Sequence, residues 1–332
     1  MNISLRWLQL SDLHLFDSTE WNVMKKEYEV VFKNKKIDFV IITGDLHQFG
    51  DDYSKTLEFL ENLMEYLQLT KSDIFIIPGN HDINSFKHKD LIIRDICEKM
   101  SSDQDYYYKY YGDLMESYNS YKVFLKEFYQ DYYGEYEKII NGHNLFTWKE
   151  KINILAMNST LICDGERNHY QILNIRDLTT LSINNGFPTI ACSHHNIDDL
   201  LPSHNKLLSK VLSSQNVSVY LCGDQHLYSE KPLQRNDCSV ECITCGKSAC
   251  EPQDTYSEIG FILYEVDAYD NCFCHPYLWE GKNKMRFEPY HGLEEKIGTP
   301  KSFKLCKTVS PSKKTGINSQ TANGQYGYQM PN

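Results

Sequence analysis

The sequence lacks the features of a membrane or secreted protein. No apolar run approaches the roughly 18 residues that a membrane-spanning helix needs. Met1 leads almost directly into a strand-like segment, without the apolar leader of a secreted chain. We therefore expect a cytoplasmic protein with no membrane partner.

Positive charge is also scarce. The chain of 332 residues has 34 Lys and Arg against 45 Asp and Glu, which gives a formal net charge of -11. Nonspecific affinity for nucleic acid comes largely from Lys and Arg, so this deficit argues against an extended surface that follows a phosphate backbone. It leaves open a nucleotide or a nucleic-acid end held by cationic metals.

The eleven cysteines are an odd number for a disulfide framework. Several stand inside apolar, strand-like runs, which favours reduced and buried thiols. A zinc site is the alternative, although irregular spacing and strand-like alternation speak against it. The cysteines that it would draw on are Cys238, Cys242, Cys245, Cys250, Cys272 and Cys274.

Strand-like and helix-like segments alternate along much of the chain, which predicts a layered α/β fold with mixed sheets flanked by helices. The ranges with helical periodicity are 22–34, 53–67 and 205–212. The ranges that predict buried strands are 5–10, 37–42, 73–77, 152–157, 188–193 and 217–222. Further strand-like runs at 240–245, 260–266 and 272–278 have no helix between them and predict an antiparallel continuation of a sheet.

Two segments break this alternation. Residues 84–150 are polar and rich in tyrosine, which predicts a helical insertion or cap. It contains an aromatic stripe spaced for one helix face, which comprises Tyr118, Tyr121, Phe124 and Phe128. Either this stripe packs on the core, or some of the tyrosines form a wall of the substrate cleft. Residues 299–332 are polar and glycine-containing and predict a flexible tail, so one domain at 1–298 carries the fold.

Five short polar motifs each follow a strand-like run. They are Ser-Asp12-Leu-His14, Gly44-Asp45, Gly79-Asn80-His81-Asp82, Ser-His194-His195 and Gly223-Asp224-Gln-His226. Residues just past the carboxyl ends of parallel strands gather along one edge of a sheet, so we expect one site. An Asp or Asn after a strand is usually a helix cap or a turn residue, and the prediction therefore rests on the order and shared context of the motifs.

This series of motifs resembles the calcineurin-like metallophosphoesterase superfamily, whose signature runs D-x-H, G-D, G-N-H-[DE], H and G-H-x-H. The resemblance covers roughly residues 1–295, and four of the five motifs match outright. It implies a metallophosphoesterase-type sandwich. It also implies hydrolysis of a phosphodiester or phosphomonoester by a hydroxide that bridges two divalent metal ions.

The resemblance assigns a role to each motif. The first metal would be held by Asp12, His14 and His226, and the second by Asn80 and His194, with Asp45 bridging both. His81 would act as the general acid, and Asp82 would orient its imidazole. Weaker candidates for substrate contacts are His47, His195 and Arg167, and the alternative for these is ordinary hydrogen-bonded or loop structure.

One departure from the family pattern concerns the second metal. Asp224 stands where G-H-x-H has its first histidine. A carboxylate adds negative charge and favours harder ions, so we expect Mn²⁺ ahead of Fe, Mg, Co or Zn. The alternative is a weakened second site in a noncatalytic interaction module that uses the aromatic insertion or the tail as its contact surface.

The motifs also bear on the substrate. Protein phosphatases of this superfamily carry G-D-x-V-D-R-G and G-N-H-E, whereas this chain has Gly44-Asp45-Leu-His47-Gln48 and Gly-Asn-His-Asp82. The pattern is closer to cyclic-nucleotide phosphodiesterases and to DNA-repair exonucleases. Acidity and the aromatic insertion favour a phosphorylated small molecule, such as a nucleotide, or a nucleic-acid end over a long duplex.

Overall fold

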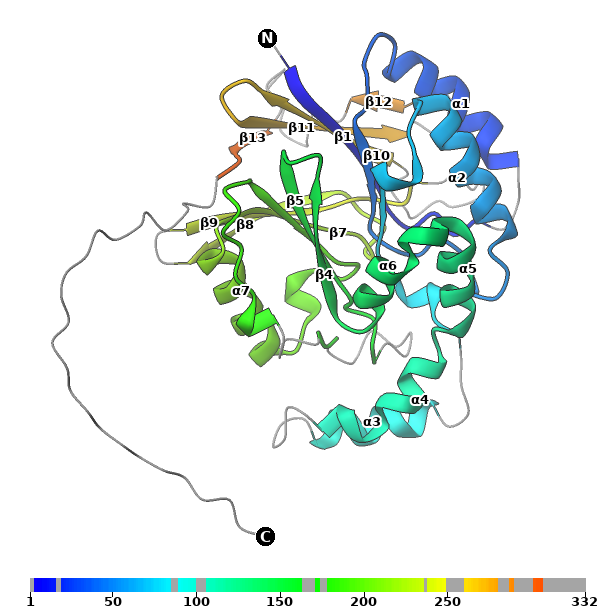
Figure 1. Ribbon diagram of the computed structural model, residues 1–332, viewed down its shortest axis with the longest axis vertical. Coiled ribbons are helices and arrows are strands. Elements are labelled where there is room, and N and C mark those ends of the chain that lie inside the picture. The colour runs from blue at the N-terminus through cyan, green and yellow to red at the C-terminus, as the bar shows by residue number, and fades with distance from the viewer. Residues whose placement is uncertain are drawn as a thin grey trace, which may run out of the picture.

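Two mixed β-sheets form the centre of the molecule, and helices lie outside them (Figure 1). The structure is a computed structural model. It describes residues 3–15, 19–84, 89–99, 106–162, 171–173, 178–235, 238–248, 260–279, 287–289 and 301–306. None of the helices within these ranges is long and apolar enough to cross a membrane.

The first sheet has seven strands among the described residues, in the order β12-β11-β10-β1-β2-β3, with β13 also paired to β11. The three parallel strands are β1 (Ile3–Leu10), β2 (Phe39–Ile42) and β3 (Ile74–Ile76). The antiparallel strands are β10 (Gly260–Asp267), β11 (Asn271–Trp279), β12 (Phe287–Pro289) and β13 (Lys301–Lys304). Helices α1 (Thr19–Val31) and α2 (Ser54–Leu67) connect the parallel strands.

The second sheet has six strands in the described part of the chain, in the order β4-β5-β6-β7-β9-β8. Its parallel strands are β5 (Ile152–Met157), β6 (Thr189–Cys192), β7 (Val217–Cys222) and β9 (Cys238–Thr244). The antiparallel edges are β4 (His143–Trp148) and β8 (Ser229–Arg235), and helix α7 (Pro202–Ser214) connects β6 to β7.

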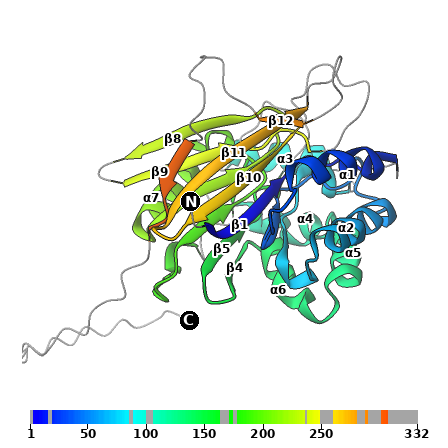
Figure 2. The same cartoon turned by 90° about the horizontal axis from the view of Figure 1, so that it is seen from above.

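Period-two alternation of side chains builds a core on each face of the second sheet. Within the first sheet, Trp7 of β1 stacks on Tyr264 of β10 with ring centroids 4.7 Å apart. Trp148 of β4 contacts the first sheet, with its ring 5.1 Å from that of Phe39 in β2. The opposite face of the second sheet forms a separate cluster with Leu208 and Leu212 of α7. Figure 2 shows α7 on the side of the molecule opposite α1 and α2.

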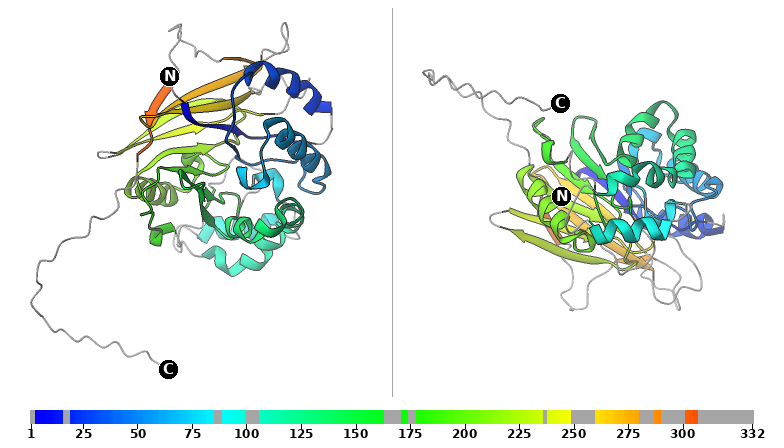
Figure 3. Two further views of the ribbon diagram at one scale, coloured as in Figure 1. Left: turned by 45° about the horizontal axis from the view of Figure 1, so that its top comes forward. Right: turned by 90° about the horizontal axis from the view of Figure 1, so that it is seen from below.

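The predicted insertion contains α3 (Lys89–Lys99), α4 (Tyr111–Glu116), α5 (Asn119–Tyr129) and α6 (Tyr133–Ile140), and Figure 3 shows α3 and α4 away from the sheets. Its aromatic stripe is buried, and Phe124 stacks on Tyr53, which directly precedes α2, with ring centroids 4.7 Å apart. The stripe is therefore part of the core, as the first of the two interpretations predicts. Short 3-10 turns cover Lys71–Asp73, Asn80–Asp82, Tyr106–Tyr110, Gln130–Tyr132, Leu178–Thr180 and Ile197–Asp199.

Two element boundaries and the pairing of three strands also differ from the sequence prediction. Residues 143–148, placed in the insertion, form edge strand β4. The strands predicted as one antiparallel continuation divide between the sheets, because β9 pairs parallel to β7 while β10 and β11 join the first sheet. Residues 301–304, placed in the tail, pair with β11, and Leu305 is buried behind them. Local alternation marks a strand but does not choose its partner. Residues 307–332 of the predicted tail lie outside the described ranges.

The eight cysteines with described side chains are free thiols, and six of them are buried. Among the described residues, no cluster able to hold a metal includes a cysteine. Five of the buried thiols lie on strands; they are Cys192, Cys222, Cys242, Cys272 and Cys274.

Candidate metal centre

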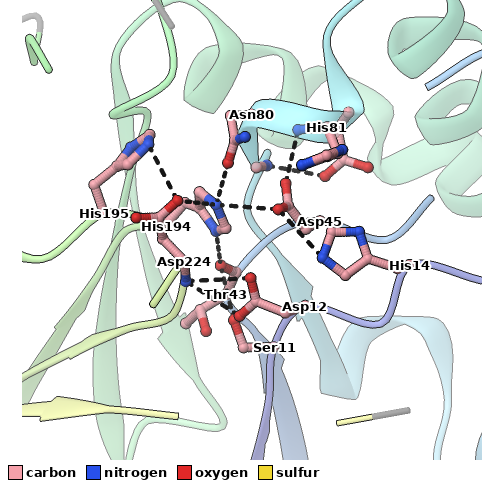
Figure 4. Close-up of polar contacts among 12 residues, drawn as sticks. Ser11, Asp12, His14, Thr43, Asp45, Asn80, His81, His194, His195 and Asp224 are labelled. Carbon is pink, nitrogen blue, oxygen red and sulfur yellow. Dashed lines mark hydrogen bonds and ion pairs between the residues drawn. The ribbon is translucent and has the colours of Figure 1, made fainter. Parts of the chain in front are cut away.

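The five motifs meet where the two sheets adjoin, each at the carboxyl end of its strand (Figure 4). Backbone hydrogen bonds join the loops in pairs. The amide of His14 donates to the Asp45 carbonyl at 2.9 Å, and that of Gly223 donates to the His194 carbonyl at 2.8 Å. The site therefore draws on three strands of the first sheet and two of the second, rather than on the edge of a single sheet.

Five residues of these loops adopt left-handed backbone conformations. The φ angles lie between 46° and 67° for Asp12, His14, Asp45, Asp224 and His226. This conformation costs about 1–2 kcal/mol for a non-glycine residue, although Asp accepts it more readily than most. Such strain typically persists at functional sites because the surrounding structure holds it, and here it aims five side chains at one point.

The glycines that precede three of the motifs allow the loops to approach one another. A Cβ added to Gly79 would lie 2.1 Å from both the amide nitrogen and Oδ1 of Asp45. A Cβ added to Gly223 would lie 1.8 Å from Ser11 Oγ and 2.5 Å from Asp12 Oδ2. Gly79 and Gly223 are therefore required by the packing around the neighbouring carboxylates of Asp45 and Asp12.

Replacing Gly79 by alanine should consequently displace Asp45. We expect Gly79→Ala to lower the free energy of unfolding by about 1–3 kcal/mol, as overpacking does, and to weaken divalent-metal binding at least ~10-fold. Urea unfolding and calorimetric titration with Mn²⁺ measure the two effects. Gly134→Ala in α6 is the matched control, because its Cβ would have no atom within 4 Å. Wild-type metal affinity in Gly79→Ala would contradict this account.

The first group of ligand atoms comes from Asp12, His14 and His226. Nε2 of His14 lies 3.2 Å from Nε2 of His226, and His226 Nε2 lies 3.5 Å from Asp12 Oδ1. Two nitrogen ligands about 2.1 Å from one ion lie roughly 3 Å from each other. Burial lowers the pKa of His14 to about 4, which keeps the imidazole neutral and its lone pair available. The group therefore fits a cation.

The second group surrounds the ring of His194, which is fully buried. Nδ1 of His194 lies 2.7 Å from the Thr43 carbonyl, to which it can donate a hydrogen bond. Nε2 then faces Asn80 Oδ1 at 2.7 Å, Asp45 Oδ2 at 3.4 Å and Asp224 Oδ1 at 3.6 Å. One nitrogen and three oxygens thus point at one another, which is the donor set of a divalent transition metal.

Asp45 belongs to both groups. One carboxylate oxygen, Oδ2, lies 3.7 Å from His14 Nε2 and 3.4 Å from His194 Nε2. The other, Oδ1, accepts a hydrogen bond from the His81 amide at 2.8 Å. A carboxylate between two sets of ligands is suited to holding two cations close together.

The charges of the site demand positive charge at its centre. Burial alone would raise the pKa of Asp45, but His194 and His14 outweigh it and hold the carboxyl below its ordinary value. Burial lowers the pKa of His194, yet Asp45, Asp12 and Asp224 together raise it well above its ordinary range. The carboxylates therefore draw a proton onto the buried imidazole, and bound divalent cations would meet the same demand.

His81 lies at the edge of the centre and is oriented differently from the sequence prediction. Its Nδ1 is 2.9 Å from the Gln48 carbonyl, and its ring is 4.7 Å from that of His14. Asp82 instead accepts hydrogen bonds from the amides of Leu46 at 3.0 Å and Gly79 at 2.9 Å. The prediction that Asp82 orients the His81 imidazole is wrong, because this carboxylate fixes the two loops to each other.

Asp82 is fully buried, and this environment alters its protonation. Burial and the nearby Asp45 raise the pKa of Asp82 to about 7, against the effect of the amides that donate to it. The Tyr53 hydroxyl donates a hydrogen bond to the Asp82 carbonyl oxygen at 3.1 Å. The Tyr53 ring stacks on Phe124 of the aromatic stripe. Tyr53 thus connects Phe124 of the insertion to the loop that carries Asp82.

The three weaker candidates have separate outcomes. His47 is buried, and its Nδ1 accepts hydrogen bonds from the amides of Phe49 at 3.2 Å and Gly50 at 3.1 Å, which is the structural alternative. His195 lies inside the centre, with Nε2 3.8 Å from Asp224 Oδ1. Arg167 lies outside the described residues.

Sequence reasoning missed three groups that position the imidazoles. The carbonyls of Thr43 and Gln48 hold His194 and His81, and main-chain acceptors leave no signature in the residue types. Ser159 Oγ lies 2.9 Å from His195 Nδ1. This serine follows β5 just as the five motifs follow their strands, so the same signal could have identified it.

The chain is similar in sequence to known phosphoesterases. A family model described as calcineurin-like phosphoesterase matches residues 5–228. The chain therefore belongs to the calcineurin-like phosphoesterase family, as its motifs predicted. An uncharacterized metallophosphoesterase-like protein of Bacillus subtilis, YydB, is 25% identical over 241 residues, which are 68% of this chain and 49% of that protein. The match thus spans about half the length of this relative.

Two solved structures are similar at lower identity. A dimetal phosphatase from Danio rerio is 13% identical with a TM-score of 0.49, over 87% of this chain and 99% of that one. GAP50, the anchor in the inner membrane complex of Plasmodium, is 14% identical with a TM-score of 0.47, over 93% and 91% of the two chains.

Proposed function

We propose that the chain is a phosphoric ester hydrolase that uses two divalent cations at this centre. The observation that carries the proposal is Asp45, whose carboxylate lies between two groups of ligand atoms. Asp12, His14 and His226 would hold one ion, and Asn80, His194 and Asp224 the other. When bound, the cations would lower the pKa of an attacking water and offset charge on the phosphoryl oxygens.

The side chains around the ions would divide the remaining work. His81, held through Nδ1 by Gln48, presents its other ring nitrogen for proton donation to the leaving oxygen. Asp82 keeps the Asp45 and Asn80 loops in register through their amides. No Ser or Cys nucleophile is required, because the nucleophile is water.

Hydrolysis by the metal-loaded chain tests the proposal. The protein is treated with chelator, loaded with Mn²⁺, and assayed on bis(p-nitrophenyl) phosphate and on p-nitrophenyl phosphate. Turnover that needs the metal and is lost in Asp45→Asn supports the hydrolase. Inactivity on both esters with Mn²⁺, Fe²⁺, Co²⁺, Mg²⁺ and Zn²⁺ would favour the noncatalytic interaction module instead.

Asp224 sets the expected metal preference. Its carboxylate is partly exposed and lies against the rings of His194 and His195. We expect Asp224→His to shift the ratio of Zn²⁺ to Mn²⁺ affinity about 10-fold toward Zn²⁺, because an imidazole replaces a hard anionic oxygen. Competition titrations measure this ratio without an activity assay. Asp131→His, on an exposed turn, should keep the wild-type ratio; an unshifted ratio in Asp224→His would remove Asp224 from the ligand set.

The substrate class that we propose is a nucleotide or a nucleic-acid end. The net charge of -11 supports a short ligand bound at the cations over a long duplex bound along the surface. The cytoplasmic location stays a prediction.

A further inference from the structure

The neighbouring imidazoles of His194 and His195 have different hydrogen-bond partners at Nδ1. Nδ1 of His194 lies 2.7 Å from the Thr43 carbonyl, whereas Nδ1 of His195 lies 2.9 Å from the Ser159 hydroxyl. A carbonyl can only accept a hydrogen bond, while a hydroxyl can donate or accept one. His194 therefore carries a proton on Nδ1, which leaves Nε2 for a cation. For His195 the assignment depends on the serine.

The Ser159 hydroxyl determines which nitrogen of His195 carries the proton. Ser159 is fully buried, and within the described ranges both hydrogen-bond partners of its side chain belong to His195. The His195 amide donates to Oγ at 3.0 Å, so the single hydroxyl proton is left for Nδ1. If Nδ1 carried a proton instead, this buried hydroxyl would have no acceptor in the part of the chain that the structure describes. Nδ1 therefore accepts, and Nε2 carries the ring proton.

This tautomer decides what His195 can do at the centre. The Nε2 atoms of His194 and His195 lie 3.6 Å and 3.8 Å from Asp224 Oδ1, and Figure 4 shows both rings facing that carboxylate. The spacing alone would suit three ligands of one cation. A protonated nitrogen has no lone pair to give to a cation, however. His194 is then a ligand, and His195 is a hydrogen-bond donor directed at Asp224.

The Asp224 carboxylate has no other support of this kind. Asp12 accepts a hydrogen bond from the Asp224 amide at 3.1 Å, and Asp45 accepts one from the His81 amide at 2.8 Å. Among the described residues, no group donates a hydrogen bond to the Asp224 carboxylate, and 31% of the side chain is exposed. Carboxylates that bind metals are ordinarily held by hydrogen bonds. The Nε2–H of His195 is placed to supply one.

We propose that Ser159 and His195 position Asp224 as a ligand of the second cation. The Ser159 hydroxyl donates to Nδ1 of His195, and Nε2–H would donate to the carboxylate, which keeps lone pairs for the cation. A cation-bound imidazole in place of Asp224 would present only a second N–H donor to His195. The arrangement thus gives a reason for the carboxylate at the place where the family pattern has histidine. The inference rests on the proposed function and adds two positioning residues to its metal centre.

Nitrogen NMR of the protein with isotope-labelled histidine tests the tautomer without an activity assay. Spectra are recorded at neutral pH for the metal-free and the Mg²⁺-loaded chain, and the His195 signals are those lost in His195→Gln. We expect a proton on Nε2 of His195 and none on Nδ1. Ser159→Ala should mix the two tautomers, because Nδ1 loses its donor. A wild-type His195 with its proton on Nδ1 would overturn the proposal.

Calorimetric titration with Mn²⁺ tests the positioning role. Ser159→Ala and His195→Leu should each weaken binding of the second ion about 10-fold and leave the first ion unaffected. The double variant should be no weaker than His195→Leu, because both residues act through one carboxylate. His195→Gln keeps an N–H donor and should bind more tightly than His195→Leu. A role in packing alone would make these two variants equal.

Two buried polar side chains of α7 provide matched controls. Ser209 donates to the Asn205 carbonyl at 2.8 Å, and Nδ1 of His204 accepts a hydrogen bond from the Leu173 amide at 3.2 Å. Ser209→Ala and His204→Leu therefore remove a hydroxyl and an imidazole outside the centre, and both should keep the wild-type Mn²⁺ affinity. Thermal unfolding of every variant measures structural damage separately.

The outcomes separate the inference from the proposed function. A wild type that binds fewer than two Mn²⁺ fails the function and the inference with it. If the wild type binds two, an unchanged second affinity in Ser159→Ala and His195→Leu overturns the inference while the hydrolase stands. Unchanged affinity with a raised KM for bis(p-nitrophenyl) phosphate would assign the His195 donor to the substrate, which also overturns it.

Discussion

Asp45→Asn should abolish phosphodiester hydrolysis, with kcat/KM falling at least ~1,000-fold. The carboxylate lies within 3.7 Å of an imidazole nitrogen in each ligand group, so its charge serves both cations. Loss of that charge removes several kcal/mol of transition-state stabilisation, and each 1.4 kcal/mol or so corresponds to tenfold in rate. Asparagine keeps the size of the side chain and an oxygen for the His81 amide, so the substitution isolates charge from shape.

The assay for Asp45→Asn measures turnover of bis(p-nitrophenyl) phosphate together with the metal content of the same sample. Metal content should fall below two ions per chain in parallel with activity. Asp131→Asn makes the same substitution on an exposed turn and should retain both. Activity within tenfold of wild type in Asp45→Asn would show that Asp45 does not bridge two cations.

His81→Asn should lower kcat about 100- to 1,000-fold for esters with poor leaving groups, with both metal ions retained. General acid catalysis is worth this much when the leaving oxygen is basic, and little when it leaves easily as an anion. The loss should therefore be smallest for p-nitrophenyl esters and grow as the leaving-group pKa rises. A merely structural role for His81 would lower all the rates by the same factor.

The control for His81→Asn is His275→Asn on β11, where the ring lies 3.2 Å from Glu265 in the first sheet. This variant should keep the wild-type dependence of kcat on leaving-group pKa. An unchanged dependence in His81→Asn would show that proton donation comes from another group.

The convergence of the candidate metal ligands could be predicted because the sequence signal of each one is short-ranged. Each motif couples a buried strand to a polar residue at its carboxyl end, and the sheet topology brings those ends together. Asp12, Asp45 and His194 therefore converge although they are far apart in the sequence. The glycines are visible in the motifs. The need for glycine there is not, because it depends on side chains of neighbouring loops such as Asp45 and Ser11.

What could not be predicted depends on pairings between distant segments. The strand pattern of 260–266 is the same whichever sheet receives it, and only packing places β10 against β1. Asp82 follows His81 in the sequence, yet its carboxylate turns toward the amide of Leu46. The exposure of Phe49 is equally invisible in the sequence, because phenylalanine is more often buried.

The number of divalent cations that the chain binds shows whether Asp45 joins two metal sites. Chelator-treated protein is dialysed against Mn²⁺, and bound metal is measured by elemental analysis beside Asp45→Asn and Asp131→Asn. We expect two Mn²⁺ per chain for the wild type and Asp131→Asn, and fewer for Asp45→Asn. One ion or none in the wild type would contradict a two-metal centre shared through Asp45.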